Sequence, residues 1–348
     1  MHPGDKATLR LTLGLGLATL IAYGLALTAP YVVCVMAVIL LSKPGPPLPL
    51  TKGIIVALIF AGVVAAGIVM VPLLENYALT GVLLTAVLLF TIFFAGLVSG
   101  NPLTMVLVIA FALMPVAGLV EQALVGTLAV TLAVGVAVGT LVGFISSAFF
   151  PDRTAPAAPS AQPTRPGRAA AAWISLRATL IVMPVFVLAL TNPSFYLAAI
   201  MKTVTLSQQA GETDARSAGR ELVGSTLMGA FVAVGIWSGL SLWPSLWMLV
   251  LWMMAAALWV GSAMTGARRS RFRSSFWSNA LITALILIGP AIEDSASGKS
   301  VLEGTAVRTC LFVGVALYAW GTIVLLERWR PDQLPASRTI PASEERPA

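Results

Sequence analysis

Long apolar stretches, each close to the length of a membrane-spanning helix, constrain this chain more than any other feature. Of its 348 residues, 58% are hydrophobic and only 10% are charged. A water-soluble domain needs far more charge to cover its surface, so we expect this fold to face lipid. Because a spanning helix takes about 20 apolar residues, the sequence predicts an all-α integral membrane protein with about 12 transmembrane helices.

The apolar segments fall into two sets of six. We place the first set at 8–28, 31–42, 52–72, 79–98, 102–118 and 124–149, and the second at 173–191, 194–207, 221–240, 243–265, 275–292 and 304–326. The connection between the sets is rich in Pro, Ala and Arg, which is typical of an extended linker. We therefore expect a first six-helix repeat over 1–150, a cytoplasmic linker over 151–172, a second repeat over 173–330 and a disordered tail over 331–348.

The two sets also match in their residues. Five correspondences occur in the same order: Leu25–Pro30 with Leu188–Pro193, Leu41-Ser42 with Leu206-Ser207, Pro115 with Pro290, Gly126-Thr127 with Gly304-Thr305, and Pro151-Asp152 with Pro331-Asp332. Matches in a fixed order indicate an internal repeat. Six is an even number, so the second half begins on the same side as the first and the repeats are parallel.

Charge predicts the orientation of the helices. Lysine and arginine gather at the ends expected on the side of the N-terminus, as in Lys6, Arg10 and the Arg268–Arg273 stretch. The opposite connections carry acidic residues such as Glu293 and Asp294. Cytoplasmic connections of membrane proteins are enriched in Lys and Arg, so we expect both termini to be cytoplasmic.

Segments two and eight are expected to be short. They contain 12 and 14 residues and begin after Pro30 and Pro193. At 1.5 Å per residue they reach only about 18–21 Å, against a hydrocarbon layer of roughly 30 Å. Short segments at matching places in two repeats point to a transport site, so we expect Pro30, Tyr31 and Pro193 to line a pathway. Tilted or interfacial helices with a structural role are the alternative.

Lys202 lies in the middle of segment eight, where the first half has only apolar residues such as Val38 and Ile39. A lysine at membrane depth costs about 2.5–3.5 kcal/mol on insertion scales, so it predicts a functional positive charge that attracts an anion. Extension of the amine to the inner surface is the alternative.

Two tryptophans provide candidate surfaces for an aromatic substrate. Trp252 and Trp259 lie seven residues apart and so share one helix face. Their rings could stack against an aromatic ring, whereas simple packing or lipid contact is the alternative.

Several chemistries lack the residues they need. His2 is the only histidine, and Cys34 and Cys310 are far apart inside apolar segments. We therefore predict neither a metal site nor a cofactor, and no nucleophile–base pair that would make the chain an enzyme. A nucleotide-binding motif is missing from the sequence, and the basic residues do not form a nucleic-acid face.

The six-plus-six repeat, the Pro30-Tyr31 start of the second helix and a basic residue before a Gly-rich third helix carry a family resemblance. In the second half the last feature consists of Arg220, Gly224 and Gly229. In these features the chain resembles the fusaric acid resistance and aromatic acid exporter family of bacterial inner-membrane proteins. It looks like a short form, because larger members carry a sizeable cytoplasmic domain where this chain has only a linker.

The resemblance implies an inner-membrane exporter of small organic anions such as aromatic carboxylates, working with a periplasmic membrane-fusion adaptor. Such export could be driven by the membrane potential, since moving one negative charge outwards is downhill by about 2.3 kcal/mol per 100 mV. A scaffold that anchors an adaptor, or an anion channel, is the alternative. The expected partners are the lipid bilayer and the anion; homo-oligomerisation is compatible with the sequence.

Overall fold

The computed structural model describes residues 3–42, 49–100, 104–120, 122–151, 167–212, 215–298 and 300–329. No strand occurs in these ranges. The first half contains α1 (Pro3–Gly24), α2 (Pro30–Leu41), α3 (Leu50–Ala66), the 3₁₀ turn η1 (Gly67–Val69), α4 (Met70–Asn76), α5 (Ala78–Ser99), α6 (Thr104–Val120) and α7 (Gln122–Phe149). The second half contains α8 (Arg168–Thr191), α9 (Pro193–Glu212), α10 (Ala215–Leu242), α11 (Leu246–Met264), α12 (Ser274–Ala296) and α13 (Val301–Trp329).

Proline and glycine mark several helix boundaries. Pro30 and Pro193 occupy the first turns of α2 and α9, where a missing N–H is tolerated. Gly100 ends α5 with a φ of 67°, and Gly266 follows α11 with a φ of 78°. Both glycines adopt the left-handed conformation that disfavours residues with a side chain, so they stop their helices cleanly.

Nine helical stretches in the described ranges are long and apolar enough to cross a membrane, with Leu50–Asn76 counted as one. Large apolar side chains on the outer faces are exposed, as in Leu83 at 59% and Phe231 at 70%. In water such surfaces favour association, whereas lipid accepts them. The structure thus confirms the all-helical, multi-pass membrane character. Each of the twelve predicted segments overlaps a helix, but the number of spans stays a prediction.

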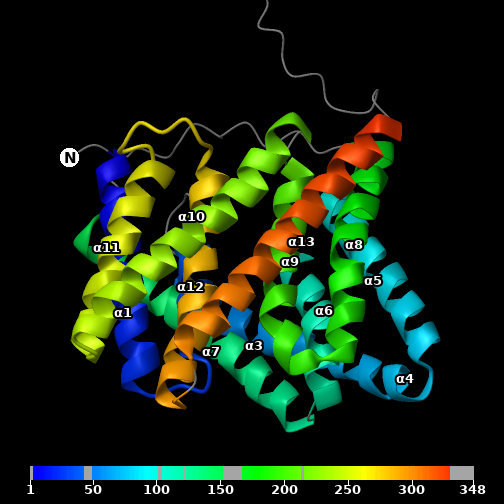
Figure 1. The fold of residues 1–348 in the computed structure, drawn as a ribbon, viewed down its shortest axis with the longest axis horizontal. Coiled ribbons are helices and arrows are strands. Elements are labelled where there is room, and N and C mark those ends of the chain that lie inside the picture. Colours follow the sequence, from blue (N-terminus) through cyan, green and yellow to red (C-terminus); the bar gives the residue numbers. More distant parts are fainter. Residues whose placement is uncertain are drawn as a thin grey trace, which may run out of the picture.

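Hydrogen bonds between helix ends bring three parts of the chain together that are far apart in the sequence. The Nζ of Lys6 donates to the carbonyl of Pro151 at 3.2 Å, and the Oγ1 of Thr265 donates to the carbonyl of Gly4 at 3.1 Å. The start of α1 therefore meets the ends of α7 and α11. In Figure 1 the N-terminus, the connection between α11 and α12, and the end of α13 lie along the same edge of the molecule.

The two halves interlock rather than forming separate bodies. Within the halves, α1 packs on α2 as α8 packs on α9, and α3 packs on α7 as α10 packs on α13. Between the halves, α1 contacts α11 while α5 contacts α8, and α2 contacts α12 while α6 contacts α9. Each of these contacts thus has a counterpart with the halves exchanged. Figure 1 shows α10 and α13 running side by side across the front of the bundle.

The central helix of the bundle is α12. In its apolar stretch 83% of the residues are buried, against 28% for α5 and for α13. It contacts α2, α9, α10, α11 and α13. A helix enclosed on all sides must be apolar or have every polar side chain paired, because unpaired polar groups are costly away from water.

Two expected boundaries are wrong. The predicted linker over 151–172 is too long, because α8 begins at Arg168 and the following run of alanines favours helix. Segment eight is also longer than expected: α9 has 20 residues, since the polar residues after Ser207 continue the helix beyond the apolar run. By contrast, α2 has the predicted 12 residues. Residues 152–166 of the linker and the tail over 331–348 lie outside the described residues.

Candidate functional site

The ammonium group of Lys202 is held in the interior of the bundle. Lys202 lies near the middle of α9, and its side chain is fully buried, with 0% exposure. Its Nζ donates to the Oδ1 of Asn279 at 3.0 Å and to the Oγ1 of Thr283 at 2.6 Å, both on α12. The amine therefore turns toward the central helix and does not extend to the surface.

The partners of Lys202 are themselves oriented by hydrogen bonds. The Nδ2 of Asn279 donates to the Oγ of Ser225 on α10 at 2.6 Å, and that hydroxyl donates to the carbonyl of Leu222 at 3.2 Å. The Thr283 hydroxyl donates to the carbonyl of Asn279 at 2.6 Å. Both hydroxyl hydrogens thus point to backbone oxygens, which leaves lone pairs for the donors of Lys202 and Asn279. We call Lys202, Ser225, Asn279 and Thr283 the Lys202 network.

The network leaves the charge of Lys202 without a countercharge. No carboxylate lies within ion-pair distance of Lys202 among the residues that the structure describes. An ammonium group has three donors. Two of them bind Asn279 and Thr283, and the third has no partner in the described part of the chain.

Close approach of α10 to α12 makes the network possible. A Cβ placed on Gly229 would lie 2.5 Å from the Cβ of Thr283 and 2.6 Å from the carbonyl oxygen of Ala280. Any side chain here would push the two helices apart, since carbon atoms prefer separations of about 3.5–4.0 Å. Gly224, five residues earlier, would carry its Cβ 3.2 Å from the ring of Phe276. The motif glycines therefore lie beside the network, whereas Arg220 is exposed.

Of the three residues predicted to line a pathway at the starts of α2 and α9, Tyr31 packs against the same central helix. Tyr31 packs against Gly289 of α12, where an added Cβ would lie 2.3 Å from the Cγ of Tyr31. Pro30 and Pro193 are partly buried at the first turns of α2 and α9. The structure thus brings Tyr31 and Lys202 to one helix, α12, about two turns apart between Thr283 and Gly289.

The two tryptophans on α11 have other surroundings. Trp252 packs against Gly239 of α10, where an added Cβ would clash with its ring. Trp259 is 40% exposed and packs edge-on against Trp277, with ring centroids 5.6 Å apart. Neither tryptophan contacts the Lys202 network in the structure, so stacking with a substrate held by Lys202 stays a prediction.

Asn279, Thr283 and Ser225 were not predicted, because uncharged polar side chains stand out less in an apolar run than the charge of Lys202 does. A signal was present. Asn279 and Thr283 are four residues apart on one apolar helix, and Ser225 and Gly229 are four apart on another. Such spacing places each pair on one face. Small and polar residues at this spacing are typical of helix–helix contacts in membranes.

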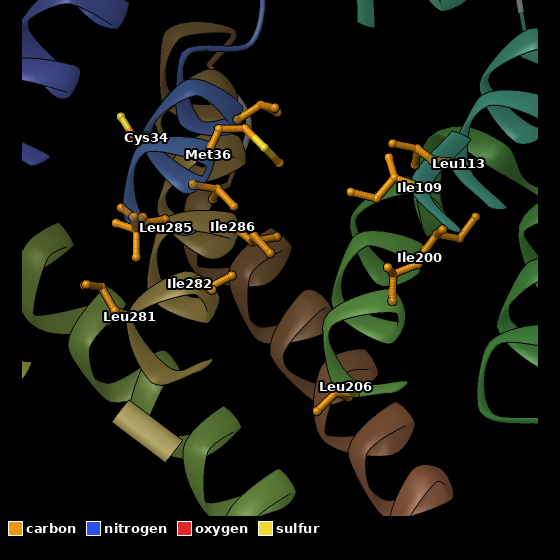
Figure 2. Close-up of a cluster of buried hydrophobic side chains, with 14 of the residues drawn as sticks. Cys34, Met36, Ile109, Leu113, Ile200, Leu206, Leu281, Ile282, Leu285 and Ile286 are labelled. Atoms are coloured by element: carbon orange, nitrogen blue, oxygen red, sulfur yellow. The ribbon is translucent and has the colours of Figure 1, made fainter. Parts of the chain in front are cut away.

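Apolar side chains of four helices face one another in the interior of the bundle, at the level of the network. In Figure 2, Met36 of α2 with Ile282 and Ile286 of α12 lie opposite Ile109 of α6 and Ile200 of α9. All five side chains are less than 10% exposed, so little of this region is reached by solvent. We call these five residues the central seam. It lies between the two pairs of helices that join the halves, α2 with α12 and α6 with α9.

An ion pair closes the opposite end of α12. The Nη1 of Arg308 on α13 lies 2.6 Å from the Oδ2 of Asp294, with both side chains less than one quarter exposed. Glu293 lies within electrostatic range of Arg308 and of Tyr23 and Tyr31. An acidic and a basic group therefore tie α12 to α13 at this end.

Comparison of the chain with protein-family models, with curated proteins and with solved structures gives no match. The resemblance to the fusaric acid resistance and aromatic acid exporter family therefore stays a prediction, carried by the residues named for it: Pro30-Tyr31, Arg220, Gly224 and Gly229.

Proposed function

We propose that this protein exports small organic anions, aromatic carboxylates among them, and that Lys202 is the charge partner of the substrate. The observation that carries the proposal is a fully buried lysine whose described partners are all neutral. A charge at this depth is costly without a partner. An anion that enters the bundle supplies the missing countercharge and accepts from the third ammonium donor, so its binding is favoured there.

The central seam supports the choice of an organic rather than an inorganic anion. Ile282 directly precedes Thr283, and Ile200 lies two residues before Lys202. These positions place the seam at the level of Lys202 but on other faces of α9 and α12, because residues one or two apart do not share a helix face. An organic anion, unlike an inorganic one, has an apolar body that could extend from Lys202 to that level. Binding sites for small molecules commonly combine apolar walls with a few polar groups that fix orientation.

For the architecture we propose twelve spans in two parallel six-helix repeats. The paired contacts between helices support this arrangement, because exchanging the halves converts α1–α11 into α8–α5 and α2–α12 into α9–α6. Parallel repeats of this kind place a transport site at their interface. The protein would lie in a bacterial inner membrane with cytoplasmic termini, and the membrane potential would favour outward movement of the anion.

The proposal is tested by transport of radiolabelled benzoate in proteoliposomes. Asn279→Asp is the decisive variant, because it places a carboxylate at the position of the amide oxygen, 3.0 Å from Nζ, with almost no change in volume. Lys202→Met removes the charge at similar length. Both variants are expected to lose at least about tenfold in transport, the effect of a single charged hydrogen bond.

Ser207→Ala is the matched control. Ser207 is also buried on α9, but its hydroxyl donates only to the carbonyl of Val204 in its own helix. If Asn279→Asp folds as well as the wild type and still transports benzoate at the wild-type rate, Lys202 is not the anion partner. Single-channel conductance would favour a channel. A rate that ignores an imposed potential would exclude export driven by the potential.

A further inference from the structure

The connection between α11 and α12 forms a strongly basic surface at one end of the bundle. Residues 265–273 read Thr-Gly-Ala-Arg-Arg-Ser-Arg-Phe-Arg, and all four arginines are exposed. We call this segment the arginine loop. It lies beside the start of α1, because the backbone of Ala267 approaches Gly4 and Thr265 donates to the carbonyl of Gly4.

Alternate residues hold the arginine loop in a defined shape. The guanidinium carbon of Arg268 lies 5.0 Å from the centre of the Trp259 ring and 5.4 Å from that of Trp277. The Nε1 of Trp277 donates to the Oγ of Ser270 at 2.8 Å. Phe272 stacks on Phe276 with centroids 4.2 Å apart. A cation over two indoles and a partly buried indole hydrogen bond stabilise the loop.

The intervening arginines make none of these contacts. Arg269 and Arg271 are exposed, and neither has a hydrogen-bond or ion-pair partner among the described residues. Arg273, next in this alternation, lies 3.7 Å from the carboxylate of Glu221. The guanidinium groups of Arg269 and Arg271 are thus exposed without a partner, while the side chains on either side of them are held by the contacts described above.

The enrichment of positive charge on cytoplasmic connections accounts for the sign of this loop but not for its density. In the repeat, the connection between α5 and α6 corresponds to that between α11 and α12. Its residues 100–103 are Gly-Asn-Pro-Leu, without any charge. The orientation of the helices does not require four arginines in this connection, because the corresponding connection between α5 and α6 has none.

We propose that the arginine loop binds the phosphate headgroup of an anionic phospholipid of the phosphatidylglycerol type through Arg269 and Arg271. A guanidinium group matches a phosphate with two parallel hydrogen bonds, which an ammonium group does not. Trp259, 40% exposed beside the loop, has the amphipathic ring that settles at the level of lipid headgroups. Its indole packs against the glycerol end of the same lipid. This site is separate from the Lys202 network and does not depend on transport.

Native mass spectrometry of the full-length protein, released from nanodiscs that contain phosphatidylcholine and phosphatidylglycerol, tests the proposal. The double variant Arg269→Gln, Arg271→Gln is expected to bind phosphatidylglycerol about 30-fold more weakly, as two basic residues near a membrane surface predict. The control is Arg168→Gln, Arg328→Gln, which removes two exposed arginines from the start of α8 and the end of α13. It is expected to retain the lipid.

Equal loss in both double variants would show diffuse attraction and overturn the proposal, as would retention in both. A photoreactive phosphatidylglycerol on the wild type gives an independent result if the arginine variant inserts poorly. Labelling should concentrate in the peptide that contains residues 266–277, and uniform labelling of that end of the bundle would contradict the site. Soluble glycerol phosphate should not displace the lipid at equal concentration; if it does, the loop binds free phosphate instead.

Discussion

Replacing Gly229 by alanine tests whether the close contact of α10 with α12 holds the Lys202 network together. The added Cβ would lie 2.5 Å from the Cβ of Thr283 and 2.6 Å from the carbonyl oxygen of Ala280. The helices must separate by roughly 1 Å to restore an ordinary carbon–carbon distance. Because one obstructing atom belongs to the backbone, a rotamer change cannot relieve the clash. Overpacking of this kind costs about 1–3 kcal/mol.

Gly235 is the matched control on the same helix, because a Cβ at that position meets nothing within 4 Å. Gly235→Ala is expected to be neutral or to stabilise by about 0.5–1 kcal/mol, since alanine favours a helix interior over glycine. Thermal unfolding followed by tryptophan fluorescence in detergent measures both variants. Gly229→Ala should lower the midpoint and Gly235→Ala should not.

Gly229→Ala and Gly235→Ala also show whether the contact between α10 and α12 matters for transport as well as for stability. Thr283 accepts a hydrogen bond from Lys202 at 2.6 Å, so displacement of α12 should also weaken benzoate transport. If Gly229→Ala unfolds at the same temperature as Gly235→Ala, the contact between α10 and α12 is not as close as described and the argument fails. A destabilised variant with full transport would refute only the link between the contact and the network.

Two further variants test the ends of the bundle. Arg308→Gln should lower stability by about 1–2 kcal/mol, because it leaves the partly buried carboxylate of Asp294 unpaired; adding Asp294→Asn should cost little more, and strictly additive losses in thermal unfolding would contradict the pairing. Trp277→Phe removes the hydrogen bond to Ser270, worth about 1 kcal/mol, so trypsin should cut the arginine loop about fivefold faster. An unchanged rate of cutting would show that this bond does not hold the loop.

The fold was largely predictable because the lipid environment leaves few choices. Apolar runs near 20 residues long must be helices there, and each predicted segment overlaps a helix. Lengths were less predictable where polar residues continue a helix. The segment around Lys202 ended at Ser207 in the prediction, whereas α9 extends to Glu212. An apolar run measures the part of a helix that faces lipid or core, and helix-forming polar residues can extend it at no cost.

The site was predictable only in part, because a sequence identifies costly residues more readily than their partners. Lys202 stands out by its charge, but nothing local indicates that Asn279, 77 positions later, accepts its hydrogen bond. Trp252 and Trp259 show a second reason. Their spacing fixes a shared helix face correctly, yet the neighbours of that face depend on how α11 packs, and it packs on α1, α10 and α12.

The unequal chemistry of the two halves fits their shared framework. The contacts that join the halves come in equivalent pairs, α2 with α12 and α9 with α6. Only the second half carries a charge at this level, because the equivalent stretch of α2 is apolar around Val38 and Ile39. The Lys202 network ties α9, α10 and α12 together, so these helices would move as one unit with the substrate's charge attached. Under the proposed function, the first half would need only to offer an apolar wall, to which the buried side chains of Met36 and Ile109 could contribute. An anion bound in this way would cross with its charge held by one repeat while the other repeat moves past its apolar body.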